Sequence, residues 1–261
     1  RGADGRSWGL AAASGLAFFL GLASKEQAAM TLPFLGAWLL LAPGARAPRA
    51  RGLALLAPHL LALVAYLAIR SVALGGPAAT GGVVAGLGER LARNYYILPA
   101  YLGLVLFPDS LSIHHPLPEG YLALWWLPLV WLAILAALVL LLRRPSPAST
   151  FGLLWLGLNL VPILGFVPIP STAHTLMAER FFHFSAVGLW IVLADLLQRL
   201  ARGAWERPAW AAAALVLGAL GVRSWVRNRD WKDDFALFGS AVRANPRSLL
   251  ARFDYGVELK D

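Results

Sequence analysis

Long apolar stretches alternate with short polar ones along most of the chain. Seven stretches are apolar enough to suggest membrane spans, each of which needs roughly 20 mostly apolar residues. They cover residues 8–23, 28–42, 53–74, 122–142, 151–169, 181–200 and 209–225. The pattern therefore predicts an all-α, multi-pass transmembrane helical bundle over residues 1–226.

The first two apolar stretches are separated only by Ser24, Lys25, Glu26 and Gln27. Joined together they would be too long for one span, because a helix rises about 1.5 Å per residue. We therefore expect a helical hairpin with Lys25 and Glu26 near its tip. The alternative is one long span that buries a Lys–Glu pair, which lipid penalises.

The longest polar interval covers residues 75–121 and begins with a glycine-rich stretch. Helical spacing predicts a helix over 89–107, carried by Leu91, Tyr95, Leu98, Leu102 and Val105. Its tyrosines suit the headgroup level of a bilayer, so we expect an interfacial helix. Pro108 and Asp109 should end it, and residues 112–120 should form a loop with two prolines and two histidines.

The tail changes character after Trp225. Residues 230–244 have an amphipathic helical pattern, Asn245 and Pro246 should stop that helix, and Ser248 should cap a second one. Two helices joined by a proline turn are typical of the tetratricopeptide (TPR) repeat. We expect residues 227–261 to be the start of a TPR array that the chain leaves incomplete; an isolated soluble helical hairpin is the alternative.

Composition supports a membrane protein, because 59% of residues are hydrophobic and 14% are charged, against about 25% charged in soluble domains. The net charge of +9 could suggest nucleic acid, but the arginines lie in short clusters between apolar stretches. The positive-inside rule produces such clusters, and it places the N-terminus in the cytoplasm and the TPR end outside. We expect no nucleic-acid partner. The absence of cysteine excludes disulfides and thiolate metal sites.

Polar residues gather in three segments that this topology places on the outer side, namely 24–27, 109–119 and 171–183. Charges near membrane depth are functional candidates because lipid penalises them otherwise. Lys25 and Arg180 are suited to hold a phosphate, the first as a point charge and the second as a fork. Glu26 and Glu179 would orient those cations. Structural ion pairs at helix ends are the alternative.

Histidines in the same segments raise the question of a metal. Glu179 and His183 are four residues apart on an expected helix, His174 lies just upstream, and His114 and His115 lie in another outer loop. Nothing in this spacing fixes a ligand geometry, so we assign no metal site. The sequence also has no nucleophile-and-base signature and no glycine-rich phosphate loop.

Four stretches together resemble the membrane O-mannosyltransferases that carry C-terminal TPR repeats (the TMTC type) and their bacterial relatives in the GT-C class of glycosyltransferases. The resemblance covers nearly the whole chain, and the order and spacing of the stretches carry it. They are residues 22–27 (LASKEQ), 101–108 (YLGLVLFP) with Leu111 and Ser112, 177–188 (MAERFFHFSAVG) and 227–234 (RNRDWKDD).

The resemblance implies a GT-C-like fold, a polyprenyl-phosphate-linked sugar donor used on the outer face, and transfer to a protein hydroxyl or another acceptor. It also implies that the catalytic carboxylate, and a divalent metal if one is used, belong to a loop upstream of this chain, so that no catalytic residue lies here. The donor-phosphate residues would be Lys25, Arg180 and Arg93, with Glu26, Glu179 and His115 orienting them. Where the family often has an acidic residue, this chain has His114 and His115.

Two other functions fit the same pattern. A non-enzymatic membrane anchor would present the TPR array to a protein partner, with Lys25 and Arg180 in structural pairs. A transporter of lipid-linked sugars would need broken helices or inverted repeats, which the hydropathy does not show. Alanine, arginine and glycine are abundant, which suggests a bacterial source and therefore a bacterial inner membrane.

Overall fold

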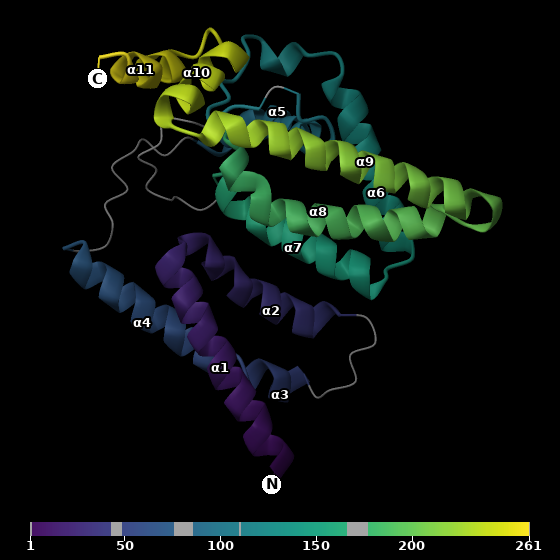
Figure 1. The fold of residues 1–261 in the computed structure, drawn as a ribbon. Helices are drawn as coiled ribbons and strands as arrows, with labels where there is room; N and C mark the ends of the chain where they lie inside the picture. Colours follow the sequence, from purple (N-terminus) through teal and green to yellow (C-terminus); the bar gives the residue numbers. More distant parts are fainter. Residues whose placement is uncertain (1, 43–48, 76–85, 110, 166–176, 261) are drawn as a thin grey trace. The chain divides into compact units, whose positions relative to one another are not determined.

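All regular structure that the computed structural model describes is helical, as the sequence predicts. The structure describes residues 2–42, 49–75, 86–109, 111–165 and 177–260. Among these the only β pairing is a single bridge between His115 and Met177. The α-helices are α1 (Gly2–Ser24), α2 (Thr31–Leu41), α3 (Arg49–Ala54), α4 (Ala57–Ala73), α5 (Leu87–Leu106), α6 (Leu127–Arg143), α7 (Pro147–Ile163), α8 (Glu179–Leu200), α9 (Glu206–Arg227), α10 (Asp234–Ala244) and α11 (Leu249–Glu258) (Figure 1).

In the part of the chain that is described, four helical segments are long and apolar enough to cross a membrane. They are Ser7–Ser24, Arg51–Ala73, Glu179–Leu200 and Gly203–Trp231. The other three predicted spans are also helices, but α6 and α7 have 17 residues each and α2 has 11. At about 1.5 Å per residue these are shorter than a hydrocarbon core of about 30 Å. The multi-pass membrane fold is confirmed, whereas the count of seven spans stays a prediction.

The predicted break at Lys25 is present. Helix α1 ends at Ser24, Lys25 is extended with φ −158° and ψ 125°, and a short 3₁₀ helix (Glu26–Met30) leads into α2. Both Lys25 and Glu26 are exposed. The alternative of one continuous span through residues 8–42 is therefore wrong.

The chain divides into two compact units. The first comprises residues 1–84, 144–170 and 187–192, and the second comprises 85–143, 171–186 and 193–261. The units thus do not follow a boundary at residue 226, because the tail helices belong to the same unit as α5 and α6. The domain division at 226 and 227 stays a prediction.

In the first unit, α1 packs most extensively on α4 (Figure 1). The two helices approach closely because Gly15 has no side chain to meet Pro58, where a Cβ would lie 2.8 Å from the Pro58 Cβ. Beside this crossing the Ser14 hydroxyl and His59 Nε2 are 3.0 Å apart. His59 is 4% exposed, so this hydrogen bond gives one of its buried ring nitrogens a partner where water is scarce.

Aromatic rings hold α2 against α7 in the same unit. The Phe34 ring lies 4.9 Å from that of Phe151 and 5.0 Å from that of Trp155, both edge-on. Trp38 meets Phe151 in the same way at 5.4 Å. Such edge-to-face pairs contribute on the order of 1 kcal/mol beyond their burial.

In the second unit, α5 forms as predicted. Its buried residues are Asn94, Ile97, Pro99 and Tyr101, and not those whose helical spacing predicted the helix. Pro99 has no N–H, so the Tyr95 carbonyl lacks its usual helical donor. The Trp131 indole N–H of α6 donates to that carbonyl at 3.0 Å, and the two rings stack. A proline that interrupts α5 thereby creates a binding point for α6.

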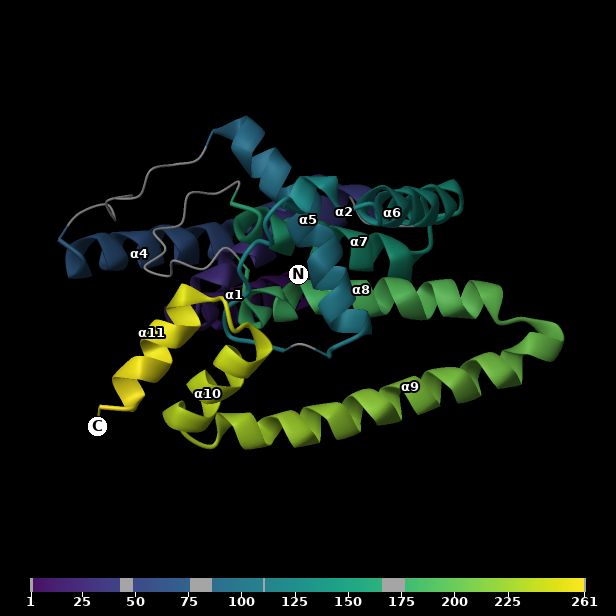
Figure 2. The same cartoon turned by 90° about the horizontal axis from the view of Figure 1, so that it is seen from above.

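The tail folds as the sequence predicts, with α9 leading into the α10–α11 hairpin (Figure 2). The Asp233 carboxylate accepts from the Ala236 N–H at 2.7 Å and caps α10. The Ser248 hydroxyl accepts from the Ala251 N–H at 3.2 Å and caps α11, and Asn245 ends α10. These two helices pack on each other. Whether they begin a TPR array stays a prediction.

The middle of α8 crosses α7 within the first unit, and this crossing gives a stability prediction. A Cβ on Gly188 would lie 2.5 Å from the Gly152 carbonyl oxygen, which cannot move away cheaply. We expect Gly188→Ala to destabilise the protein by about 1–3 kcal/mol through overpacking. Thermal unfolding in detergent measures this.

Gly157→Ala is the matched control, because Gly157 lies in α7, the other helix of this crossing, and a Cβ there would meet nothing within 4 Å. Its stability should equal or exceed that of the parent, since alanine favours a helix. Equal melting temperatures for the two variants would contradict the proposed close crossing.

Candidate functional site

The first turn of α8 carries Glu179 and Arg180, and a buried tyrosine fixes where that turn begins. Ala178 precedes the helix in an extended conformation and is 0% exposed. The Tyr101 hydroxyl of α5 donates to the Ala178 carbonyl at 3.2 Å and accepts from the Ala178 N–H at 3.1 Å. The Tyr101 ring also stacks on Phe182, 4.8 Å away. One side chain thus supplies both hydrogen-bond partners that this buried backbone needs.

Burial raises the pKa of Tyr101 to about 12. The phenol is therefore neutral at physiological pH and keeps the proton that it donates to Ala178. This residue was not among the predicted site residues, because an interfacial tyrosine has no sequence signal that distinguishes packing from positioning.

Loop 111–115 lies against the first turn of α8. The Glu179 carboxylate accepts a hydrogen bond from the Ser112 backbone N–H, and its Oε1 lies 3.2 Å from His115 Nε2. The His115 backbone N–H donates to the Met177 carbonyl at 3.1 Å. His115 and Glu179, both predicted as orienting residues, are therefore in contact, with Glu179 as the shared acceptor; their orienting role stays a prediction.

Arg180 also contacts loop 111–115 but remains exposed. One of its guanidinium nitrogens donates to the Ile113 carbonyl at 3.1 Å. The guanidinium also lies over the Phe181 ring, 4.9 Å from its centre. A guanidinium has five N–H donors, so this arrangement orients the group without using all of them.

The α10–α11 hairpin contacts the other side of loop 111–115. His114 Nε2 lies 3.2 Å from Asp254 Oδ2, and the Asn245 side-chain amide donates to the His114 carbonyl at 3.1 Å. The Ile113 side chain is buried together with Ala241 and Ala251. Asp254 and Asn245 were not among the predicted site residues, because both lie more than 100 residues from their partners and only the fold brings them together.

Burial lowers the pKa of His114; Asp254 opposes that shift, and Arg180 and His115 add to it. Among the described residues His114 Nδ1 has no hydrogen-bond partner, so a second proton on the ring would be buried without an acceptor. The neutral form with Nε2–H donating to Asp254 fits this position.

Two of the predicted site residues, Lys25 and Glu26, lie in the first unit. Glu26 Oε1 lies 2.5 Å from a guanidinium nitrogen of Arg70, which also donates to the Tyr66 hydroxyl at 3.1 Å. The Arg70 guanidinium holds the pKa of the Glu26 carboxyl below its usual value. Glu26 thus pairs with Arg70 of α4, a residue that the sequence analysis did not select. Lys25 lies beside it in the exposed turn.

Arg93 is the remaining predicted phosphate ligand. It pairs with Glu89 one turn earlier in α5, so part of its charge is already balanced. In the structure Lys25 and Glu26 belong to the first unit, and Arg93, His115, Glu179 and Arg180 belong to the second. Of these, the structure brings together His115, Glu179 and Arg180.

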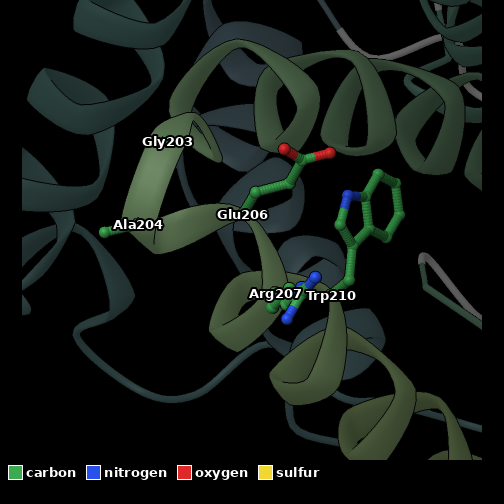
Figure 3. Close-up of a pocket in the computed structure, with 5 residues that line it drawn as sticks. All are labelled: Gly203, Ala204, Glu206, Arg207 and Trp210. Atoms are coloured by element: carbon green, nitrogen blue, oxygen red, sulfur yellow. The ribbon is translucent and has the colours of Figure 1, made fainter.

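Two further features of the described residues bear on cofactors and ligands. Within the described ranges no three His, Asp or Glu residues are grouped as metal ligands. His183 Nδ1 instead lies 2.6 Å from the Arg180 carbonyl, and His174 is outside the described residues. An open hollow of about 890 Å³ at the α8–α9 turn is lined by Gly203, Ala204, Glu206, Arg207 and Trp210 (Figure 3). It contains none of the predicted site residues.

The fold and this polar cluster define an all-α membrane protein whose α8 begins with an exposed, oriented arginine. The chain is similar over part of its length to protein O-mannosyl-transferases. It is 26% identical to TMTC3 of Mus musculus over 158 residues, 58% of this chain. It is 29% identical to Tmtc3 of Drosophila melanogaster over 96 residues, 36% of the chain, and 35% identical to Tmtc1 of the same species over 98 residues, 35% of the chain.

The matched region covers 17% of the mouse protein and 10% of each fly protein. The chain therefore spans a small part of the length of these relatives. No family model and no solved structure matches it.

Tyr101→Phe tests the anchoring of α8. The substitution keeps the ring stacked on Phe182 but leaves the buried Ala178 N–H without its acceptor. We expect a loss of about 1–3 kcal/mol in the free energy of unfolding. Thermal unfolding measures it, with Tyr255→Phe in α11 as the control because that ring packs on Phe235. Equal effects of the two substitutions would contradict an anchoring role for the Tyr101 hydroxyl.

The pKa of His114 predicts how loop docking depends on pH. Because its folded pKa is below the usual 6.5, the undocked loop binds a proton more readily than the docked loop. Docking should therefore be complete above about pH 6.5 and weaken as the pH falls below that value. Amide hydrogen exchange of Ser112 and His115 at pH 7.5 and 5.5, corrected for chemical exchange rates, measures this. His114→Gln should abolish the pH effect; an unchanged pH effect in that variant would contradict the assignment.

Proposed function

We propose that this chain is the donor-binding membrane portion of a glycosyltransferase of the GT-C class, which transfers a mannose-like sugar from a polyprenyl phosphate to a protein hydroxyl. The observation that carries the proposal is the oriented, exposed guanidinium of Arg180 at the first turn of α8. The partial similarity to proteins named O-mannosyl-transferases supports it. The proposed place of action is the outer face of a bacterial inner membrane.

Each charged residue has a proposed role in this reaction. Arg180 and Lys25 bind the lipid phosphate, with Arg93 as a further cation, while Glu179, His115 and Glu26 orient the cations or their surroundings. A carboxylate elsewhere in the full-length protein removes the proton from the acceptor hydroxyl. The hydroxyl oxygen then forms a bond to the anomeric carbon with inversion, and the bond from that carbon to the phosphate oxygen breaks.

The cations contribute because negative charge develops on the departing phosphate. Fixed positive groups in a site of low dielectric constant stabilise that charge more in the transition state than in the bound donor. Arg180 suits this task since its orientation is set in advance by Ile113 and Phe181. A divalent metal, if the reaction uses one, would be held mainly by residues outside this chain.

The test compares Arg180→Ala and Lys25→Ala in the full-length protein, with Arg247→Ala and Lys260→Ala as exposed controls of the same charge in the tail. We expect each test variant to lower sugar release from a polyprenyl-phosphate donor by at least about tenfold, because each removes a charge that stabilises the leaving phosphate. The controls should stay near the parent rate. Turnover within about threefold of the parent for both test variants would contradict the assigned role.

An alternative function is a membrane anchor that presents the α10–α11 hairpin to a protein partner. The observation that favours it is a set of exposed apolar side chains on α11, with Leu249 82%, Phe253 69% and Val257 44% exposed. Large exposed apolar patches mark interaction sites in many proteins. The two functions are separated by the assay above, because an anchor would release no sugar and would still bind its partner after Arg180→Ala.

A further inference from the structure

Loop 111–115 has little structure of its own, so its conformation depends on what surrounds it. Within the loop, the Ser112 hydroxyl accepts from the His114 N–H at 3.3 Å. Every other contact described above leads outward, either to the start of α8 or to the tail hairpin. The Ser112 side chain is 0% exposed and Ile113 is 8% exposed, so the loop is held from both sides.

Some groups of the loop contact the start of α8, and others contact the α10–α11 hairpin. Ser112 and His115 bind Glu179, and the Ile113 carbonyl binds Arg180. The Ile113 side chain and two polar groups of His114, namely its Nε2 and its carbonyl, instead contact the hairpin. Because successive residues are covalently joined, the hairpin cannot release Ile113 and His114 without changing the peptide groups that hold Glu179 and Arg180.

We propose that the α10–α11 hairpin is a positioning element for the start of α8, with Asp254 and Asn245 as positioning residues that act through His114 on Glu179 and Arg180. The contacts to the hairpin are largely buried, with His114 12% and Asp254 24% exposed. A protein that binds the hairpin and alters these contacts therefore changes the orientation of Arg180. The inference rests on the proposed function only where it concerns donor binding.

The first measurement needs no donor. In the full chain in lipid nanodiscs, hydrogen exchange reports on the Ser112 and His115 amides, whose N–H groups bind Glu179 and Met177. We expect Asp254→Ala, which removes the acceptor of the His114 Nε2–H, to speed their exchange by about tenfold, the equivalent of one lost hydrogen bond of ordinary strength. Glu258→Ala is the matched control, since it also removes a carboxylate one turn later in α11, and it should leave these amides at the parent rate.

A second variant covers the case in which Asp254→Ala unfolds the hairpin itself, which faster exchange of the α10 and α11 amides would reveal. His114→Ala removes the same contact from the loop side and leaves the hairpin sequence intact. It should speed the Ser112 and His115 amides as well, with the hairpin amides unchanged. If both of these amides keep the parent rate in His114→Ala, the inference is overturned.

Donor kinetics then separate this inference from the proposed function. In the full-length enzyme Asp254→Ala should raise the donor KM by at least about threefold, with a smaller change in kcat, because it disturbs the orientation of Arg180 and removes no catalytic group. Faster exchange with an unchanged donor KM supports the positioning role and overturns the phosphate role of Arg180. Unchanged exchange with a raised KM overturns the positioning route through loop 111–115.

Discussion

The second unit depends on one carboxylate that accepts hydrogen bonds from a loop with no regular structure. Glu179 receives the Ser112 N–H and contacts His115, so the loop between α5 and the α6 region is held against the start of α8. A partly buried carboxylate needs such donors, since an unpaired one would cost several kcal/mol. The same contact fixes Arg180, because the loop carbonyl that it binds is only one residue from Ser112.

Other helices in the protein approach one another by different means. At the α1–α4 crossing the Ser14 hydroxyl and His59 Nε2 form a hydrogen bond inside an apolar contact. In α5 the carbonyl left open by Pro99 is satisfied by Trp131. At the α7–α8 crossing Gly152 and Gly188 let the backbones meet directly. Each solution lets helices approach in a medium where hydrophobic attraction between helices is weak.

The local pattern of residues was enough to predict the helices, but not which other parts of the chain they contact. The break at Lys25, the helix over 87–106, and the Ser248 cap follow from interactions within a few residues, and sequence analysis placed them closely. The burial of Asn94 and Ile97 in α5 could not be predicted, because helical spacing does not tell which neighbouring helix covers each face. The contact of Trp131 with the Tyr95 carbonyl depends on tertiary structure in the same way. Pairs such as Arg70 with Glu26 and Asp254 with His114 depend on tertiary structure, so no spacing rule could indicate them.

The two proposed functions require different things of the tail hairpin. An anchor needs a hairpin that folds and exposes a binding face, and any contact with loop 111–115 would serve only to attach it. Attachment alone would be achieved by apolar packing such as that of Ile113 on Ala241 and Ala251. The added hydrogen bonds of Asp254 and Asn245 are directional, and they act on the loop that orients Arg180. Directional polar contacts fix geometry more than they add stability, which favours a site whose charged group must be held in place.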